Sequence, residues 1–346
     1  MKALRRRGFV GRAAAWVAAA HPLAAALQAG CAASLPTHAA AGAGDGAAGA
    51  GSSAERAADG VWVFRGVPGD IGPDTLARHG NGGFVVGSKG VLAIDAGVSH
   101  AQGRERLAAI RATTSAPVLG VLLTHAMQDF IFGATAFQDA GIPVLMHKDA
   151  AQLMTARCDT CLKTLKREIG EAAMAGTRVP KADRVFATSD EARAVMPDIG
   201  RALRLVFAEP KSQTATPGAT AVLDEASGTL FAGALLDART VPDIQDADLA
   251  AWQAARAGLR ALNARRIVPG RGPIGGTAIV DEVDAYIAAL EASVDAFVKA
   301  GRPLSDVADA IELPRFAAWD RYDTTHRRNA SILYLRRERE LIIRSG

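Results

Sequence analysis

The sequence predicts an α+β fold in which two β-sheets pack face to face and helices cover their outer faces. Three observations lead to this expectation. The chain has 346 residues, 49% of them hydrophobic, which is enough for a sizeable core. Short apolar segments alternate with amphipathic ones, and this order occurs twice along the chain. No uninterrupted apolar run reaches about 18 residues, so no membrane span is expected.

Residues 1–41 have the features of a signal peptide, because a basic stretch precedes a weakly apolar segment from Ala13 to Leu27. The segment Arg6-Arg7-Gly8-Phe9-Val10 resembles a twin-arginine export motif, and a plain Sec leader is the alternative. Leu27 to Cys31 resembles a lipoprotein cleavage box, which would place a lipid anchor on Cys31. Ala39-Ala40-Ala41 is a competing cleavage site. We therefore expect an exported, periplasmic protein.

The net charge of +4 comes from the leader. Residues 1–41 hold five basic residues and no acidic one, so the remainder has 35 basic and 36 acidic residues and a net charge of −1. A surface of that composition is not typical of nucleic-acid binding, and no nucleic-acid partner is expected.

Residues 42–58 are rich in Gly, Ala and Ser and are predicted to form a flexible linker. A main domain is predicted over 59–312. Its first segment, Val61 to Val67, alternates in polarity and is interpreted as an edge strand. Gly82 to Gly87 and Val91 to Asp95 are predicted to form a hairpin around a Gly-Ser-Lys-Gly turn.

The rest of the first half alternates between helices and buried strands. Its predicted elements are a helix over 103–114, a strand over 117–124, a loop over 125–129, a helix over 130–140, a strand over 142–146 and a helix over 148–174. His147, directly after the last strand, is expected at a surface turn, and His79 in an exposed loop beside the pocket.

The second half repeats this rhythm. Its predicted elements are strands over 202–207, 220–224, 229–232 and 264–268, and helices over 249–262, 278–300 and 304–312. A polar, helical extension is predicted over 313–346, and the charged run from Arg336 to Arg344 is interpreted as a solvated helix face.

Cys158 and Cys161 are three residues apart in a predicted helix, so both thiols lie on one face. Oxidising surroundings would allow a disulfide, and two unreactive thiols are the alternative. A four-thiolate zinc site lacks ligands.

Four short segments follow predicted strands, and their order resembles a known family. They are Ile94–Gly97, Thr124–Phe130, Phe231–Ala234 and Val268–Pro273. Over residues 60–300 this order is similar to the metallo-β-lactamase superfamily, whose fold is an αββα sandwich of zinc hydrolases. The resemblance implies that fold for this chain, and it implies a structural role for Asp95, which would brace the ligand loop.

A finer resemblance is to the exported quinoprotein relay system zinc metallohydrolases. It is carried by the segment Gly80–Gly87, the Cys-x-x-Cys insert ending in Ala175-Gly176-Thr177, and His326-Arg327-Arg328-Asn329. Such proteins are associated with pyrroloquinoline-quinone dehydrogenases. The resemblance therefore implies a quinoprotein dehydrogenase system, or a small-molecule ligand, as the partner.

The metal-ligand pattern of the superfamily is degenerate in this chain. The family writes T-H-x-H-x-D-H, a histidine before T-P-G, F-A-G-D and P-G-H-G-P. The first histidine is kept as His125 and the aspartate as Asp129. The other five ligand positions are Met127, Phe130, Ala215, Ala234 and Arg271. Zinc catalysis needs about three protein ligands and an open position, so we expect no zinc cofactor.

The replacements lead to a structural prediction. By the resemblance, Asp129 and Arg271 stand where two ligands of one metal ion would be. A buried, unpaired carboxylate is costly, and an arginine can neutralise it through a bidentate contact. We therefore predict that the Arg271 guanidinium replaces the charge of the second metal and that the two side chains lie within about 6 Å.

Three functional hypotheses follow. The first is a metal-free binding or accessory protein with a pocket formed by His125, Met127, Phe130, Ala215, Ala234 and Arg271. The second is a hydrolase with an altered site, in which one metal is held by His125, Asp129 and a further residue not identified from the sequence, and Asp129 is the remnant catalytic residue. The third is a copper site on Met127 and His125, since methionine is a soft ligand.

Overall fold

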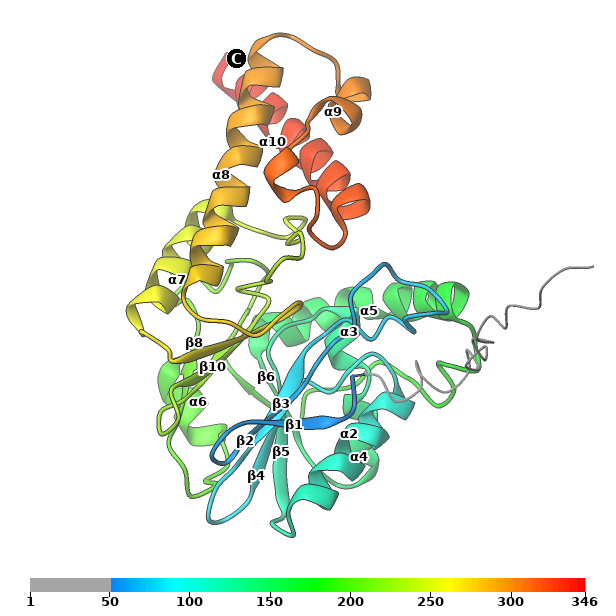
Figure 1. Ribbon diagram of the computed structural model, residues 1–346, viewed down its shortest axis with the longest axis vertical. Coiled ribbons are helices and arrows are strands. Elements are labelled where there is room, and N and C mark those ends of the chain that lie inside the picture. The colour runs from blue at the N-terminus through cyan, green and yellow to red at the C-terminus, as the bar shows by residue number, and fades with distance from the viewer. Residues whose placement is uncertain (1–50, 346) are drawn as a thin grey trace, which may run out of the picture. The chain divides into compact units, whose positions relative to one another are not determined.

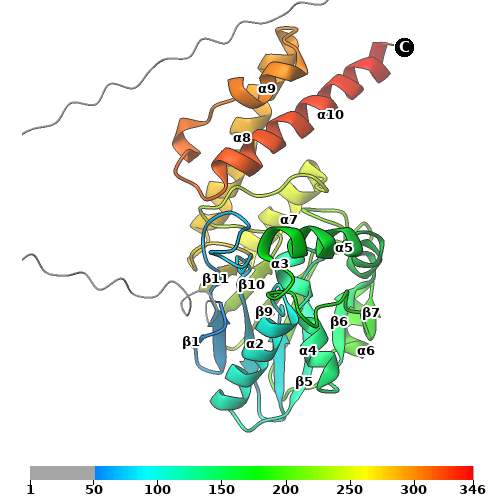
Figure 2. The same ribbon diagram turned by 90° about the vertical axis from the view of Figure 1, so that its right-hand side faces the viewer.

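The computed structural model describes residues 51–345, and the account below is confined to them. The expected signal peptide, the lipid anchor at Cys31 and the linker up to residue 50 lie outside the described residues. No helix within 51–345 is long and apolar enough to cross a membrane. The described residues form two β-sheets with helices on both outer faces, as the sequence predicts (Figures 1 and 2).

The larger sheet has seven strands in the order β1-β2-β3-β4-β5-β6-β7. Neighbours from β1 to β4 are antiparallel, and neighbours from β4 to β7 are parallel. The strands are β1 (Ala54–Ala58), β2 (Val61–Phe64), β3 (Gly82–Val86), β4 (Val91–Ile94), β5 (Val118–Leu123), β6 (Val144–His147) and β7 (Arg184–Phe186).

The linker prediction is wrong for its last residues. Ala54–Ala58 form β1 and pair antiparallel with β2, so β2 is an inner strand and not the edge. The segment is poor in apolar residues, and the strand forms because the backbone of β2 offers it hydrogen-bond partners. Arg65, directly after β2, forms an ion pair of 2.6 Å with Glu55 of β1. The amino-acid composition of a segment does not predict such a tertiary contact.

The smaller sheet has four strands in the order β11-β10-β9-β8. The pair of β10 and β11 is parallel, and the other pairs are antiparallel. The strands are β8 (Leu203–Val206), β9 (Ala221–Asp224), β10 (Thr229–Gly233) and β11 (Arg266–Pro269).

The alternating direction of side chains along each strand separates the core into layers. Successive side chains point to opposite faces of a strand, so one set lies between the sheets and the other faces the helices. The layer between the sheets contains Val61, Val63, Val85, Leu92, Ile94, Leu122 and Leu145 against Val222, Phe231 and Val268. The next residues in turn, such as Ala93, Val121 and Leu123 in the larger sheet and Leu223, Leu230 and Ile267 in the smaller, pack against helices.

The helices are α2 (His100–Thr113), α3 (Gln128–Ile131), α4 (Ala134–Asp139), α5 (Lys148–Ile169), α6 (Ser189–Val195), α7 (Leu249–Ala261), α8 (Ala278–Lys299), α9 (Leu304–Ala310) and α10 (Arg327–Ser345). The single helix expected over 130–140 is two helices, α3 and α4. Gly133 separates them, and its amide donates to the carbonyl of Gly97 at 2.9 Å. A Cβ at Gly133 would lie 2.0 Å from the Ala96 carbonyl oxygen, so only glycine fits this approach.

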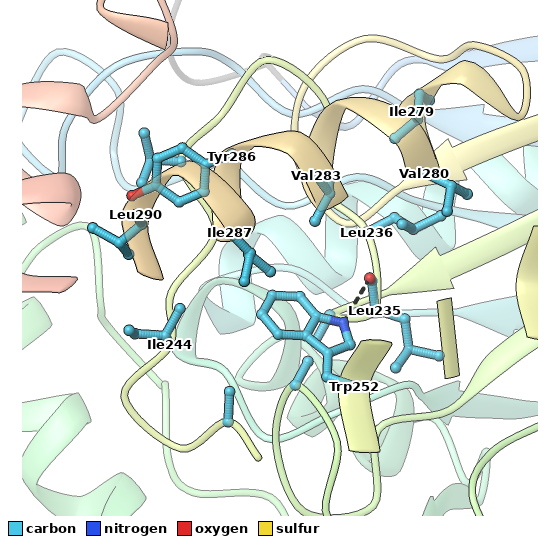
Figure 3. Packing of buried hydrophobic residues seen from close by; sticks show 14 of the residues in the cluster. Leu235, Leu236, Ile244, Trp252, Ile279, Val280, Val283, Tyr286, Ile287 and Leu290 are labelled. Carbon is cyan, nitrogen blue, oxygen red and sulfur yellow. Dashed lines mark hydrogen bonds between the residues drawn. The ribbon is translucent and has the colours of Figure 1, made fainter. Parts of the chain in front are cut away.

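The cluster between the smaller sheet and its helices extends into the C-terminal residues. Trp252 of α7 is fully buried, and its indole N–H donates to the Leu235 carbonyl at 3.0 Å. Val283, Ile287 and other residues of α8 surround it (Figure 3). The same cluster includes Leu313, Phe316, Ala330, Leu333 and Tyr334 from the predicted extension.

His326 fixes this extension against α8. Its ring is buried, Nδ1 lies 3.0 Å from the Tyr286 hydroxyl, and Nε2 lies 2.9 Å from the Ile311 carbonyl. Nε2–H therefore donates to Ile311, while Nδ1 accepts from Tyr286. Asn329 donates to the Pro242 carbonyl at 2.7 Å and completes the junction.

Candidate functional site

The candidate site lies where several strands end. Asp95 follows β4, His125 follows β5, Ala234 follows β10 and Arg271 follows β11. The carboxyl ends of neighbouring parallel strands meet at one edge of a sheet, which is where ligand sites of α/β proteins form. The fold therefore gathers residues that are up to 176 positions apart in the sequence, between Asp95 and Arg271.

Arg271 and Asp129 form a bidentate ion pair, as the sequence predicts. Arg271 Nε donates to Asp129 Oδ2 and Nη2 to Oδ1, both at 2.8 Å. The two side chains are only 8% and 4% exposed. Burial on its own would raise the pKa of Asp129, but the charge and hydrogen bonds of Arg271 hold that pKa well below its usual range.

The remaining edges of the guanidinium are occupied too. Nη1 lies 3.3 Å from Asp237 Oδ2, and Nη2 lies 3.3 Å from the Met127 sulfur. The guanidinium carbon lies 5.1 Å from the centre of the Phe130 ring, a cation–π distance. Burial would lower the pKa of Arg271, but the carboxylates of Asp129 and Asp237 raise it, so the side chain stays charged.

Asp95 braces the loop that carries His125, which agrees with the structural role that the resemblance implies. It adopts a left-handed backbone conformation with φ of 57°. Its Oδ1 accepts from the backbone N–H of Thr124 at 2.9 Å, and the Thr124 hydroxyl lies 2.9 Å from Oδ2. Burial raises the pKa of Asp95 to about 7, against the opposing effect of the Thr124 hydrogen bonds.

His125 is fully buried beneath this loop. Its Nδ1 lies 2.7 Å from the Thr124 hydroxyl, and its ring packs on Phe130 with centroids 4.2 Å apart. Nε2 is buried without a hydrogen-bond partner within residues 51–345. Burial lowers the pKa of His125 to about 3, and the nearby Arg271 adds to the shift, so the imidazole is neutral.

A cavity of about 750 Å³ opens over the ion pair. Met127, Asp129 and Arg271 line it, whereas His125, Phe130, Ala215 and Ala234 do not. These four side chains are all buried, and Ala215 and Ala234 belong to the apolar cluster around α7 and α8. The sequence positions expected in one pocket are therefore split between a cavity wall and the core.

The residues present do not fit the zinc centre that the superfamily pattern implies. Asp129 is committed to Arg271, and Phe130, Ala215 and Ala234 offer no ligand atom. Among the residues from 51 to 345, no three His, Cys, Asp or Glu side chains are grouped so that they could hold a metal ion. A fixed guanidinium occupies the position of the last ligand, and a cation there opposes a metal ion in the same place.

Two further histidines are placed differently from the prediction. His147 is 2% exposed and not at a surface turn, because it ends β6, and its Nδ1 accepts the Asp149 amide at the start of α5. His79 is also 2% exposed, with Nδ1 2.9 Å from the Val67 carbonyl. Burial lowers the pKa of both rings.

Cys158 and Cys161 are thiols on one face of α5. Cys158 is buried in the core and Cys161 lines the cavity. A hydrogen bond from Cys158, ahead of an opposing effect of burial, lowers the pKa of Cys161 to about 7.

Sequence reasoning missed two charged residues of the site. Asp237 stands three positions after Ala234 and contacts Arg271 from the opposite side to Asp129. Arg321 lies in the extension, 50 residues beyond Arg271, and lines the same cavity. A second acid near F-A-G-A was a usable signal for Asp237, whereas nothing in the local sequence of Arg321 points to the site.

Comparisons with known proteins agree with this architecture. The sequence pattern of the Metallo-beta-lactamase superfamily matches residues 76–271. The fold is similar to a metallo-beta-lactamase from Pontibacter korlensis, with a TM-score of 0.53 and 22% identity over 67% of this chain and 97% of that one. It is also similar to a metallo beta lactamase from Hirschia baltica, with a TM-score of 0.51 and 20% identity over 68% and 96%. No curated protein matches the sequence.

The match to the family pattern spans more than half of the chain and includes the strand ends that carry Asp95, His125, Ala234 and Arg271. The structural likenesses, at 20–22% identity, support the fold. This chain belongs to the metallo-beta-lactamase superfamily.

Proposed function

We propose that this protein is a non-catalytic, ligand-binding member of the superfamily in which an ion pair takes the place of the metal centre. The observation that carries the proposal is the bidentate contact between Arg271 and Asp129, with both N–H···O distances at 2.8 Å and both side chains buried. The cavity above the pair supplies room for a small molecule, since ligand pockets span about 300–1,000 Å³.

The chemistry of arginine supports the loss of hydrolytic activity. A metal centre lowers the pKa of a bound water towards about 7 and so supplies the nucleophile. A guanidinium has no vacant coordination position and does not lose a proton in proteins. Arg271 also has Asp129, Asp237 and Met127 around it, so four of its five N–H groups are already engaged. Arg271 places a positive charge beside Asp129, as a metal ion would, but it cannot activate a water molecule.

Elemental analysis of the purified protein tests the proposal. The expected result is far less than one equivalent of zinc, copper, iron or manganese after growth in metal-supplemented medium. One equivalent of zinc would overturn the proposal in favour of a hydrolase with an altered site. One equivalent of copper would favour the Met127 and His125 site instead.

One observation favours the altered hydrolase as a second candidate. The neutral His125 ring keeps a buried Nε2 that no described residue contacts by a hydrogen bond, so it could serve as a single ligand or a base. Assays with chromogenic ester and lactam substrates, with and without a chelator, separate the two functions. Turnover that a chelator abolishes supports the hydrolase, and no turnover supports the binding protein.

The place of action and the partner are also part of the proposal. We infer export to the periplasm from the leader, and a link to quinoprotein dehydrogenase systems from the resemblance of Gly80–Gly87 and His326–Asn329. Fractionation of cells that carry the full chain tests the export, with an Arg6→Lys, Arg7→Lys variant to distinguish the twin-arginine route from Sec. Co-purification with a pyrroloquinoline-quinone dehydrogenase tests the partner.

A further inference from the structure

Arg321 is a charged residue of the cavity, and no described carboxylate contacts it directly. Within residues 51–345 its guanidinium forms no ion pair, and its one hydrogen bond is from Nε to the Gly69 carbonyl at 3.5 Å. Nη2 is buried without a hydrogen-bond partner in the same range. Burial lowers the pKa of Arg321, and the charge of Arg271 lowers it further. A partly buried cation with an unpartnered N–H group is less favourable than one that an anion contacts.

The backbone holds Arg321 firmly in this position. Its φ of 62° lies in the left-handed region, which non-glycine residues rarely adopt. The preceding residue, Asp320, is fixed on three sides. Its amide donates to Arg239 at 2.9 Å, its carbonyl accepts from Val241 at 3.0 Å, and its Oδ1 accepts from Gly69 at 2.9 Å. The unpaired side chain therefore does not result from a loosely attached segment.

The other arginines of the cavity wall each have a carboxylate partner. Arg271 pairs with Asp129, Arg157 contacts both oxygens of Asp246 at 2.6 and 2.7 Å, and Arg328 contacts Asp243 at 2.6 Å. Asp129 and Asp237 attract Arg321 electrostatically but both contact Arg271. Among residues 51–345 no carboxylate therefore lies within hydrogen-bond distance of the Arg321 guanidinium, although Asp129 and Asp237 are near enough to attract it.

We infer that the cavity binds a small monocarboxylate whose carboxylate pairs with Arg321 and whose apolar body lies against Ile71, Ala126 and Leu153. A guanidinium binds a carboxylate in a planar, two-pronged contact. The three apolar residues are half-buried and line the same cavity, as does Met127. One unpaired cation suits a single negative charge, and the exposed carboxylates of Asp70 and Glu168 at the rim disfavour multiply charged anions.

This inference rests on the proposed binding function and adds the class of ligand to it. Isothermal titration of the full chain with sodium hexanoate tests it, with 1-hexanol, hexylamine and inorganic phosphate as matched probes. Hexanoate is expected to bind, and each of the other three to bind at least about tenfold more weakly, a difference of about 1.4 kcal/mol. Phosphate binding as tightly as hexanoate, or hexanol binding equally well, would overturn the inference.

Variants of Arg321 separate binding from folding. Arg321→Met is expected to abolish hexanoate binding and to raise the Tm of the ligand-free protein, because it removes a partly buried charge that no described carboxylate contacts. Arg321→Lys keeps the charge and is expected to retain weakened binding. The matched control is Arg315→Gln, an exposed arginine of the same extension, which should change neither quantity.

Two results contradict the inference directly. Unchanged hexanoate binding in Arg321→Met would show that the carboxylate pairs with another residue. A lower Tm in that variant would show that Arg321 has a structural role. Zinc content, measured on the same wild-type sample, tests the proposed function separately. A metal-free protein that ignores hexanoate would refute the ligand class alone, whereas a zinc-loaded protein would refute the proposed function.

Discussion

Arg271 and Asp129 depend on each other because each is buried. Removing one partner of a buried pair leaves an uncompensated charge, which costs about 3–5 kcal/mol, whereas replacing both by apolar residues is often neutral. Arg271→Met is therefore expected to lower the free energy of unfolding by about 3–5 kcal/mol, and Arg271→Met with Asp129→Leu to recover most of it. Urea denaturation at pH 7 measures both variants.

A half-exposed ion pair provides the control for this prediction. Arg157 and Asp246 are 51% and 25% exposed at the side chain, and such pairs contribute about 0–1 kcal/mol. Arg157→Met should therefore change the free energy of unfolding by less than about 1 kcal/mol. Equal effects of the Arg157 and Arg271 substitutions would show that the Arg271 pair is not buried in solution.

Asp237 gives the site a dependence on pH. Burial raises its pKa from 3.8 to about 6, although Arg271 opposes the shift. The carboxyl group of Asp237 loses its proton at a lower pH in the unfolded chain than in the folded chain. Its contribution to the free energy of unfolding is therefore complete at low pH and falls as pH rises from about 4 to about 6. Asp237→Asn is expected to reduce that fall by about 1–3 kcal/mol.

Thermal unfolding between pH 4 and pH 8 measures this effect. Asp306→Asn, at an exposed position, is the control and should leave the profile unchanged. Asp95, whose pKa burial raises to about 7, contributes a fall of the same sign that persists in the Asp237 variant. A profile of Asp237→Asn identical to that of the wild type would contradict the burial of a protonatable Asp237.

At the scale of single residues, the sequence is informative where a motif supplies the expectation. The pairing of Asp129 with Arg271 could be predicted, because a lost ligand position that becomes arginine faces an acid that needs a partner. Arg321 could not be predicted, because its place depends on the contacts of Asp320 with Gly69 and Val241, far away in the sequence. The predictions of an exposed His79 and a surface turn at His147 are wrong, because a polar residue beside a strand is equally compatible with a turn and with a buried position.

Helix α2 approaches the backbone at the start of α4 very closely. A Cβ at Gly103 would lie 2.0 Å from the carbonyl oxygen of Gly133, which is a severe clash with backbone. Gly103→Ala is therefore expected to destabilise the protein by about 1–3 kcal/mol, since the two helices must separate. Chemical denaturation measures this effect.

Gly258 of α7 provides the matched control. It is an exposed helical glycine, and a Cβ there would meet nothing within 4 Å. Alanine is favoured over glycine in helices by up to about 1 kcal/mol, so Gly258→Ala should stabilise the protein. If both alanine substitutions stabilise it, the close packing of α2 against α4 is wrong.

The order of strands and helices could largely be predicted from periodicity, and the errors lie where tertiary contacts decide. β1 forms from a segment of linker composition because β2 has a free edge. The helix over 130–140 divides because Gly133 packs against Ala96. Hydrophobic periodicity and residue propensity describe one segment at a time. Both of these features depend instead on the parts of the chain that pack against the segment.

At the scale of the described molecule, the extension is part of the structure around the site. Leu313, Phe316 and Leu333 are buried in the cluster around Trp252, and Arg321 lines the cavity. Deletion of residues 313–346 is therefore expected to lower Tm by several degrees or to cause aggregation, because α8 loses its cover. Calorimetry tests this expectation.

A short deletion controls for the loss of the chain end itself. Residues 343–346 begin at the exposed Ile343, and their removal should leave Tm unchanged. If the long deletion unfolds at the wild-type temperature, the boundary predicted at 312 and 313 separates an independent domain from a dispensable tail.

Titration with zinc ions of variants that restore the superfamily's ligand pattern tests the central claim most directly. The full variant carries the substitutions Met127→His, Phe130→His, Ala215→His, Ala234→Asp and Arg271→His. A second variant carries the first four substitutions and keeps Arg271. We predict that the wild type binds no zinc, that the full variant binds about two ions, and that the variant with Arg271 binds at most one. Two ions in the variant that keeps Arg271, or tight binding of zinc by the wild type, would contradict the replacement of the metal by arginine.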